Sequence, residues 1–242
     1  MKTTENLYDL LNEYFSVDEE SINLLDEQID TDTQLEYFEL SRQYEKDLTD
    51  DEVMSRKDLI FDDSIPTEEK KVLLVQLASI DNILAYRTIE EYLRKPNIKL
   101  YEWACMALME NRLLLESKLL EENKVLITTG LGGRGNKLRY FIVFFTGDGS
   151  AITNLQQKII INELNYAFKR NGAEIENIVF HDEFATLTTI VPMNVPVQKL
   201  FNKVVRECNE FGGFLFDDYI ITNVKELSLE EIKELLALNN IL

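Results

Sequence analysis

The stretch from Lys124 to Phe145 reads KVLITTGLGGRGNKLRYFIVFF, and the residue pattern of the chain changes there. It holds two runs of strand composition, KVLITT over 124–129 and LRYFIVFF over 138–145, joined by a segment rich in glycine. Because β-branched and aromatic residues favour extended structure, the two runs predict a β-hairpin. The residues before this stretch follow a helical period, so a boundary between two parts is predicted near Asn123.

The first half of the chain repeats apolar side chains at the i, i+3 and i+4 spacing of amphipathic helices. A capping-box spacing of Ser16 with Glu19 opens a helix that continues through Ile22 to Ile29. No run of strand composition interrupts this half, so helices are predicted throughout it.

Further helix signals follow along the same half. Thr49 with Glu52 has a second capping-box spacing, and residues 72–80 are apolar nearly all round, as expected of a helix buried on several sides. Asp81 is placed to cap the helix that comes next. An all-α unit over 1–122 is therefore predicted.

One turn and the helix after it share the features of a helical repeat, with an apolar helix, a proline turn and a second helix rich in small residues. The residues that carry this pattern are Leu93, Pro96, Asn97, Leu100, Ala104, Ala107 and Leu108. The pattern resembles a HEAT-type repeat over about residues 67–122. The resemblance implies helices stacked into a superhelix, with a surface for protein partners. An unrelated helical bundle is the alternative.

The second half of the chain mixes strand and helix signals. Strands are predicted over 174–180, 184–191 and 214–224, where β-branched and aromatic residues gather. Gly172 is a C-cap signal that ends one helix, and Pro196 fits the first turn of another. Strands and helices therefore follow one another closely in this part.

Capping-box spacings at Thr153 with Gln156 and at Ser228 with Glu231 open two helices of the second half. The predicted order over 123–242 is β-β-α-β-β-α-β-α. Without its first strand and last helix, this order is that of a ferredoxin-like unit, an α+β fold. Two helices would cover one face of an antiparallel sheet and leave the other face available. Because this fold serves many tasks, it does not identify one.

Charge is distributed unevenly along the 242 residues, whose formal net charge is −19. Residues 1–70 hold 22 acidic and 6 basic side chains, whereas residues 124–172 hold 2 acidic and 7 basic ones. An acidic surface repels nucleic acid and anionic lipid, so the overall charge argues against nucleic acid as a partner. The basic segment is a local feature that suits an anion.

Four of the nine glycines lie within residues 130–137, beside three cationic side chains. The candidate anion- or partner-binding residues are Gly130, Gly132, Gly133, Arg134, Gly135, Lys137 and Arg139. Their backbone N–H groups and cations suit a phosphate, a carboxylate or the acidic surface of a partner. A strand follows where a dinucleotide fold needs a helix, and Asn136 stands where a Walker loop needs lysine, so neither motif applies. Contact with protein or RNA, or a mobile hairpin tip, are the alternatives.

Asp217 and Asp218 are the candidate functional carboxylates, because both lie inside the strand predicted over 214–224. Adjacent residues of a strand point to opposite faces, so one of the two faces the core unless the strand bulges. A buried carboxylate must be paired or protonated, and Arg139 is a candidate partner. Exposure at a strand edge is the simpler interpretation.

The single histidine, His181, precedes Asp182 and Glu183 in a predicted polar turn. No second histidine can join it, so the sequence predicts neither a metal site nor a cofactor. Cys105 and Cys208 lie on apolar helix faces and are interpreted as small core residues.

The sequence offers no catalytic constellation, so a non-catalytic, cytoplasmic protein-interaction or regulatory protein is expected, with a protein partner. A small-anion or nucleotide sensor that uses residues 130–137 is the first alternative. An enzyme of unrecognised type that uses Asp217, Asp218 or His181 is the second. The first residues lack the apolar core of a signal peptide and no stretch approaches the length of a membrane span, which favours the cytoplasm.

Overall fold

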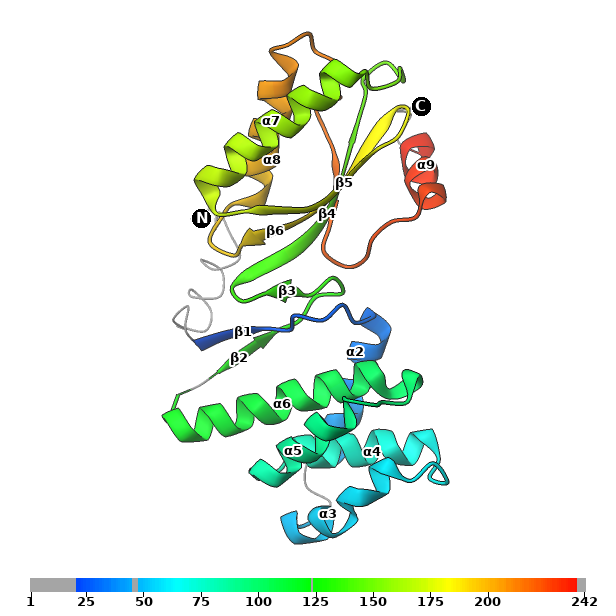
Figure 1. Ribbon diagram of the computed structural model, residues 1–242, viewed down its shortest axis with the longest axis vertical. Helices are drawn as coiled ribbons and strands as arrows, with labels where there is room; N and C mark the ends of the chain where they lie inside the picture. The colour runs from blue at the N-terminus through cyan, green and yellow to red at the C-terminus, as the bar shows by residue number, and fades with distance from the viewer. Residues whose placement is uncertain (1–20, 45–47, 123, 239–242) are drawn as a thin grey trace. The chain divides into compact units, whose positions relative to one another are not determined.

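The computed structural model describes residues 21–44, 48–122 and 124–238 (Figure 1). The described part of the chain divides between Thr128 and Thr129 into two compact units, here called the N-terminal and the C-terminal unit. Each unit contains both helix and strand, so the protein is a mixed helix and sheet structure. Ser16 and Glu19, whose spacing predicts a capping box, lie outside the described residues.

The N-terminal unit combines one short strand pair with a group of helices. Its elements are β1 (Ile22–Leu24), α2 (Thr31–Tyr44), α3 (Asp50–Arg56), η2 (Lys57–Phe61), α4 (Thr67–Ala78), α5 (Ile83–Tyr92), η3 (Ile98–Leu100), α6 (Tyr101–Leu120) and β2 (Val125–Ile127). Strands β1 and β2 run parallel, with Ile22 opposite Val125 and Leu24 opposite Ile127. The first and last described elements of the unit are thus joined by strand pairing.

This strand pair corrects two expectations. Residues 22–24 form a strand where a helix through Ile29 was expected, so the segment 1–122 is not entirely helical. The run at 124–129 pairs with β1, and it is not the partner of the strand at 138–145. The physical reason is that strand pairing is decided by a partner distant in sequence, and such a partner outweighs the local helical pattern.

The helices of the N-terminal unit pack around a common apolar core. Tyr37 is fully buried at its centre, and its ring centroid lies 5.3 Å from that of Trp103. The Tyr37 hydroxyl donates a hydrogen bond of 2.5 Å to Oε2 of Glu110. Burial, with the nearby negative charge of Glu110, raises the pKa of Tyr37 well above its ordinary value. Helix α4 is buried on several sides, as its apolar sequence predicts.

Side-chain caps set where these helices begin. The capping box of Thr49 with Glu52 is present at the start of α3, which confirms that prediction. Helix α5 is capped by Asn82, whose side chain accepts a hydrogen bond of 2.8 Å from the Leu84 N–H. Asp81 is therefore not the cap, because it lies one residue too early to reach the first turn.

The C-terminal unit is built on a curled antiparallel sheet. Its elements are β3 (Gly133–Arg134), β4 (Lys137–Phe145), α7 (Asn154–Asn171), β5 (Glu174–Phe180), β6 (Phe184–Pro192), α8 (Val197–Asn209), β7 (Ile220–Thr222) and α9 (Leu229–Leu238). The strand order is β7-β4-β6-β5, and β3 pairs with the start of β4. The strands predicted over 174–180 and 184–191 are confirmed. The strand predicted over 214–224 is shorter, because β7 holds only three residues.

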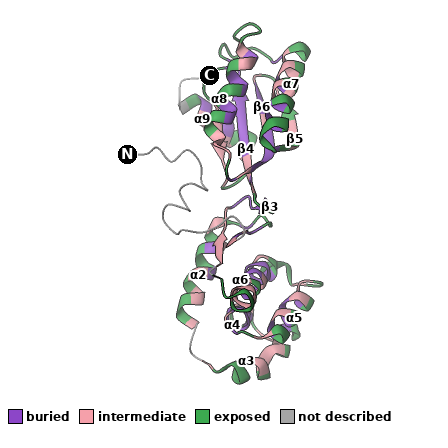
Figure 2. Cartoon of the chain, turned by 90° about the vertical axis from the view of Figure 1, so that its left-hand side faces the viewer, coloured by how far each residue is buried: buried purple, intermediate pink, exposed green. Residues whose placement is uncertain are grey.

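Alternate side chains of β4 enter two different cores, as the pleat of a strand requires. Ile142 and Phe144 pack with the buried sides of α7 and α8, whereas Phe141 and Val143 pack with α9. Figure 2 shows the buried residues of β4 and the exposed residues on the outer sides of α7 and α8. The sheet face that was expected to be available is therefore covered in part by α9.

Local signals at the turns and caps of this unit agree with the sequence. β3 and β4 are joined by a two-residue turn in which Gly135 has a φ of +62°, a conformation that favours glycine. The capping box of Thr153 with Gln156 opens α7, and Gly172 ends it in a left-handed conformation. The capping box at Thr153 and the helix end at Gly172 are confirmed predictions, because each depends on neighbours in sequence alone, whereas the β3–β4 turn was not predicted.

Candidate functional site

The glycine-rich loop is packed against the C-terminal unit. A Cβ atom added to Gly130 would lie 1.7 Å from the carbonyl oxygen of Val224, so only glycine fits there. Leu131 is 2% exposed and packs with β4 and α9, and its N–H donates a hydrogen bond to the carbonyl oxygen of Asn223. The loop therefore holds the β3–β4 hairpin in place.

The cations of the loop are paired with glutamates of β5. Lys137 Nζ lies 2.6 Å from Oε1 of Glu174, and Arg134 contacts the same carboxylate. Arg139 makes two hydrogen bonds to Glu176, of 2.5 and 3.0 Å. The hydrogen bond from Lys137 and the two neighbouring positive charges lower the pKa of Glu174. An anion at this loop would have to displace both glutamates.

Asp217 and Asp218 lie before β7 and not inside a strand, which corrects the expectation for 214–224. Both side chains are exposed, so neither needs a buried partner. Asp217 accepts a hydrogen bond of 3.2 Å from Nδ2 of Asn209, and Asp218 accepts one of 2.9 Å from the Tyr219 N–H. The strand is shorter than its composition predicts because its pairing with β4 is interrupted at these two residues: residues 220–222 form the ladder, and the Phe216 N–H separately donates a hydrogen bond of 2.8 Å to the Phe145 carbonyl oxygen.

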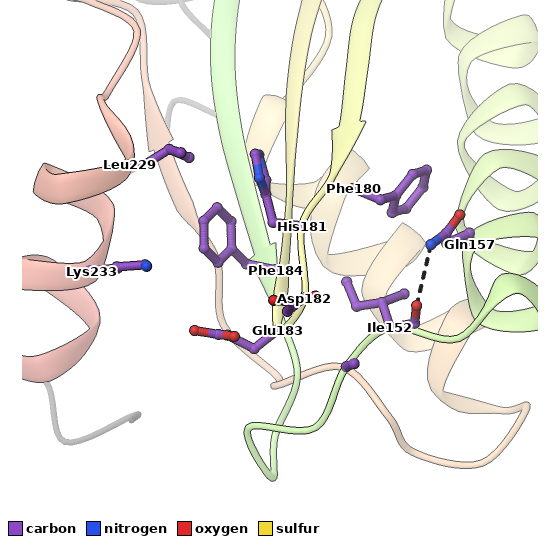
Figure 3. A pocket seen from close by; sticks show the side chains of 10 residues that line it. Ile152, Gln157, Phe180, His181, Asp182, Glu183, Phe184, Leu229 and Lys233 are labelled. Carbon is purple, nitrogen blue, oxygen red and sulfur yellow. Dashed lines mark hydrogen bonds between the residues drawn. The ribbon is translucent and has the colours of Figure 1, made fainter.

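A cavity of about 450 Å³ lies at the β5–β6 turn, beside α9 (Figure 3). His181 stacks on Phe184 there, with ring centroids 4.5 Å apart, and the His181 N–H donates a hydrogen bond to the Phe184 carbonyl oxygen. Glu183 and Lys233 reach the cavity from opposite sides. Asp217 lines a different hollow of about 510 Å³. The groups that the enzyme alternative would use are thus not brought into one site.

A third hollow, of about 370 Å³, lies between the end of α7 and the start of α8. Three of the described residues that line it are cationic and none carries a carboxylate. The cations are Arg170, Lys199 and Lys203, and we call this hollow the basic groove. Its remaining lining residues are Ala167, Asn171, Val195, Pro196 and Leu200.

The amphipathic sequence of α8 places its cations on the outside. The residues on its inner side are buried in the core: Leu200, Phe201, Val204, Val205 and Cys208. This burial leaves Lys199, Lys203 and Arg206 on the outer side, at the i, i+4 and i+7 spacing of one helix face. Lys199 and Lys203 therefore place positive charge on the outer side of the helix, whereas Arg206 forms an ion pair of 3.0 Å with Glu207.

The helical layer is basic as a whole, although the chain is strongly acidic. Helices α7 and α8 carry six basic and two acidic side chains, a formal charge of +4. The basic residues are Lys158, Lys169, Arg170, Lys199, Lys203 and Arg206, and the acidic ones are Glu163 and Glu207. The positive charge of the segment 124–172 thus continues onto a second helix that lies outside it.

The backbone adds positive charge at the same place. Pro196 is the N-cap of α8 and gives no side-chain hydrogen bond to the first turn of the helix. The first N–H groups of a helix carry a partial positive charge, which favours anions. Because Pro196 and Lys199 both line the basic groove, the start of α8 and the lysine side chains act on the same space.

Sequence reasoning predicted both helices and missed the groove between them. The signal that it did not use is the spacing of Lys199, Lys203 and Arg206, together with the adjacent pair Lys169 and Arg170 at the end of α7. The groove itself was not predictable from spacing, since two strands separate the helices in sequence and only their packing brings the cations together.

Other chemistry-bearing groups are placed without forming a site. Cys105 and Cys208 are buried, and burial raises the pKa of their thiols to about 11 and about 12. Among the described residues, no three His, Cys, Asp or Glu side chains gather in a way that could hold a metal ion. No helix within the described ranges is both long enough and apolar enough to cross a membrane.

Comparisons with known proteins give matches among solved structures only. No family model matches the chain, and no curated protein matches it. A protein of Deinococcus radiodurans R1 that is assigned as a transposase matches with 17% identity and a TM-score of 0.36, over 43% of this chain and 94% of that one. A REP-associated tyrosine transposase bound to a REP hairpin matches with 8% identity and a TM-score of 0.32, over 40% and 60% of the two chains.

These comparisons correct three expectations. The resemblance of residues 67–122 to a HEAT-type repeat is wrong, since the solved structures reported are transposases and no family model matches. The expectation of a non-catalytic protein-interaction or regulatory protein is corrected by the same two structures. So is the exclusion of nucleic acid as a partner, because one of them holds a REP hairpin. The exclusion rested on the net charge of −19, which averages over the basic helical layer.

Proposed function

We propose that the C-terminal unit binds nucleic acid through its phosphate groups, on the outer side of α7 and α8. The observation that carries this proposal is the basic groove, in which Arg170, Lys199 and Lys203 surround a hollow whose described lining residues include no carboxylate. Cationic side chains that contact phosphates supply most of the affinity of a protein for nucleic acid. The start of α8 adds backbone N–H groups suited to a phosphate oxygen.

The extent of the charge favours a chain of phosphates over a single small anion. Lys199 and Lys203 are four residues apart on α8, which corresponds to about 6 Å along the helix axis. Lys169 and Arg170 extend the positive surface to the end of α7. A ligand with several phosphates in a row can contact all these side chains at once. A single phosphate can contact only those that line the basic groove.

The acidic character of the chain is compatible with this proposal because charge acts locally. Residues 1–70 hold 22 of the 44 acidic side chains, and α7 and α8 lie outside that segment. At an ionic strength of about 0.15 M, charges separated by more than about 8 Å are largely screened. Because the described residues that line the basic groove include three cations and no carboxylate, the nearest charges to a phosphate bound there are positive.

The test replaces the three groove cations together, as Arg170→Gln, Lys199→Gln and Lys203→Gln in the full chain. Fluorescence anisotropy with a labelled oligonucleotide at low salt measures the dissociation constant. We expect binding by the unchanged protein and an affinity at least about tenfold lower in the triple variant. The side chains are exposed or partly exposed, so we expect the fold to be retained, which circular dichroism checks.

A matched control is available in the N-terminal unit. Arg94, Lys95 and Lys99 are exposed, and their replacement by glutamine changes the same number of arginines and lysines. If both triple variants lose the same affinity, the effect is one of net charge and the groove is not the binding site. If the unchanged protein does not bind any oligonucleotide at low salt, the proposed function is wrong.

We also propose the finer description of the fold and its division. The order β4-α7-β5-β6-α8-β7, with strands arranged β7-β4-β6-β5, supports a ferredoxin-like unit to which β3 and α9 are added. The division of the described residues between Thr128 and Thr129 supports a domain boundary close to the one expected between 1–122 and 123–242. Amide hydrogen exchange tests this division. If the two segments are separate domains, the amides of each segment should lose protection together and independently of the other segment.

A further inference from the structure

An exposed aromatic ring stands beside the basic groove. Tyr166 is 56% exposed on the outer side of α7, although a tyrosine ring gains free energy from burial. Arg170, one turn further along the helix, lines the groove. The Arg170 side chain donates a hydrogen bond of 3.1 Å to the Tyr166 hydroxyl, and its guanidinium lies 5.6 Å from the centre of the ring. One side chain thus connects the aromatic surface to the groove.

The arginine orients the ring and leaves much of it accessible. A hydrogen bond and a cation–π contact from the same guanidinium restrict the Tyr166 side chain to one orientation. Binding therefore costs less side-chain conformational entropy. A planar, exposed and positioned aromatic ring next to a row of cations is the combination that holds unpaired nucleotides, since phosphates contact the cations while bases stack on the ring.

We infer that Tyr166 is a stacking site for an unpaired base of a nucleic acid whose phosphates occupy the basic groove. The inference rests on the proposed function and adds the ligand class, a single strand or the unpaired part of a folded one. In a regular duplex the faces of the bases are covered by their neighbours, so only an unpaired base presents a free face to the tyrosine.

The experiment measures three ligands with the full chain by fluorescence anisotropy: a mixed-sequence single strand, the corresponding duplex, and an abasic strand of equal length with the same phosphates. The single strand is expected to bind more tightly than the abasic strand. Tyr166→Ala is expected to weaken the single strand about fivefold or more and to leave the abasic strand and the duplex unchanged. Tyr166→Phe keeps the ring and is expected to retain binding.

The control is Tyr86→Ala in the N-terminal unit, where the Arg87 guanidinium lies 5.7 Å from the centre of the Tyr86 ring. This variant removes a tyrosine in a similar arginine environment and is expected to leave all three ligands unaffected. If Tyr166→Ala binds the single strand as the unchanged protein does, while the triple cation variant loses affinity, the stacking site is wrong and the proposed function stands. If no ligand binds the unchanged protein, both are wrong.

Discussion

At the scale of single residues, the capping box before α9 shows how a pattern of four residues fixes a local charge. The Ser228 N–H donates a hydrogen bond of 2.9 Å to Glu231, and the Glu231 N–H donates one of 3.2 Å to the Ser228 hydroxyl. A hydrogen bond from Lys225, with those from Ser228, lowers the pKa of Glu231 from 4.5 to about 2. The spacing in the sequence predicted the cap but not the lysine.

The lowered pKa of Glu231 makes α9 sensitive to acid. Because the folded state favours the carboxylate, the stability that it contributes is complete above pH 4.5 and is lost as the pH falls towards about 2. Hydrogen exchange of the α9 amides across this range should show that loss of protection. Glu231→Gln should abolish the pH-dependent loss of amide protection in α9. Glu234→Gln, on the same helix, should leave that pH dependence intact. Equal pH profiles for the two variants would show that Glu231 is not the source of the acid sensitivity of α9.

At the scale of elements, a side chain of helix α6 caps the C-terminal end of helix α4. Asn111 of α6 is fully buried, and the two hydrogens on its Nδ2 are shared among the carbonyl oxygens of Leu77, Ala78 and Ile80, which lie 3.1, 3.1 and 2.7 Å from that nitrogen. The last carbonyl groups of a helix lack partners within it, so Asn111 satisfies the end of α4. Nothing in the local pattern around residue 111 indicates this role, because the partners lie more than 30 residues earlier.

Replacing Asn111 should therefore cost more than a surface substitution. Asn111→Ala leaves buried carbonyl oxygens without donors, and we expect the free energy of unfolding to fall by about 2–3 kcal/mol. Arg112→Ala, on the adjacent exposed position of α6, is the control and should change it by no more than about 0.5 kcal/mol. Denaturant unfolding followed by circular dichroism measures both. Similar losses in the two variants would show that Asn111 does not cap α4.

At the scale of the whole molecule, the distribution of charge matters more than its sum. The net charge of −19 describes the chain as a polyanion, whereas α7 and α8 together carry +4. A binding site for phosphates on such a protein must act at short range, since the long-range field is repulsive. The affinity for nucleic acid should therefore depend steeply on salt through the few cations in direct contact.

The salt dependence of binding separates local contacts from net charge. The slope of log K against log salt for a single strand should decrease in magnitude by about 2 when Arg170, Lys199 and Lys203 become glutamine, since each phosphate contact contributes about 0.7. The control variant at Arg94, Lys95 and Lys99 has the same net charge, and its slope should be unchanged. Titrations at several salt concentrations measure the slopes. A parallel change in both variants would mean that net charge alone sets the binding.

The features that could be predicted from the amino-acid sequence are those that depend on near neighbours. Each of these features follows from residues only a few positions apart. They are the capping boxes at Thr49, Thr153 and Ser228, the end of α7 at Gly172, and the strands β5 and β6. Turns, caps and side-chain periods are short-range properties, so a linear pattern contains the information that they need.

The contacts that join distant segments became known only from the folded chain. It paired β1 with β2, turned the cations of the glycine-rich loop towards Glu174 and Glu176, and covered the second face of the sheet with α9. It also brought the end of α7 to the start of α8, which creates the basic groove. The physical reason is that each of these contacts is a choice among many distant partners, settled by packing and charge together in three dimensions.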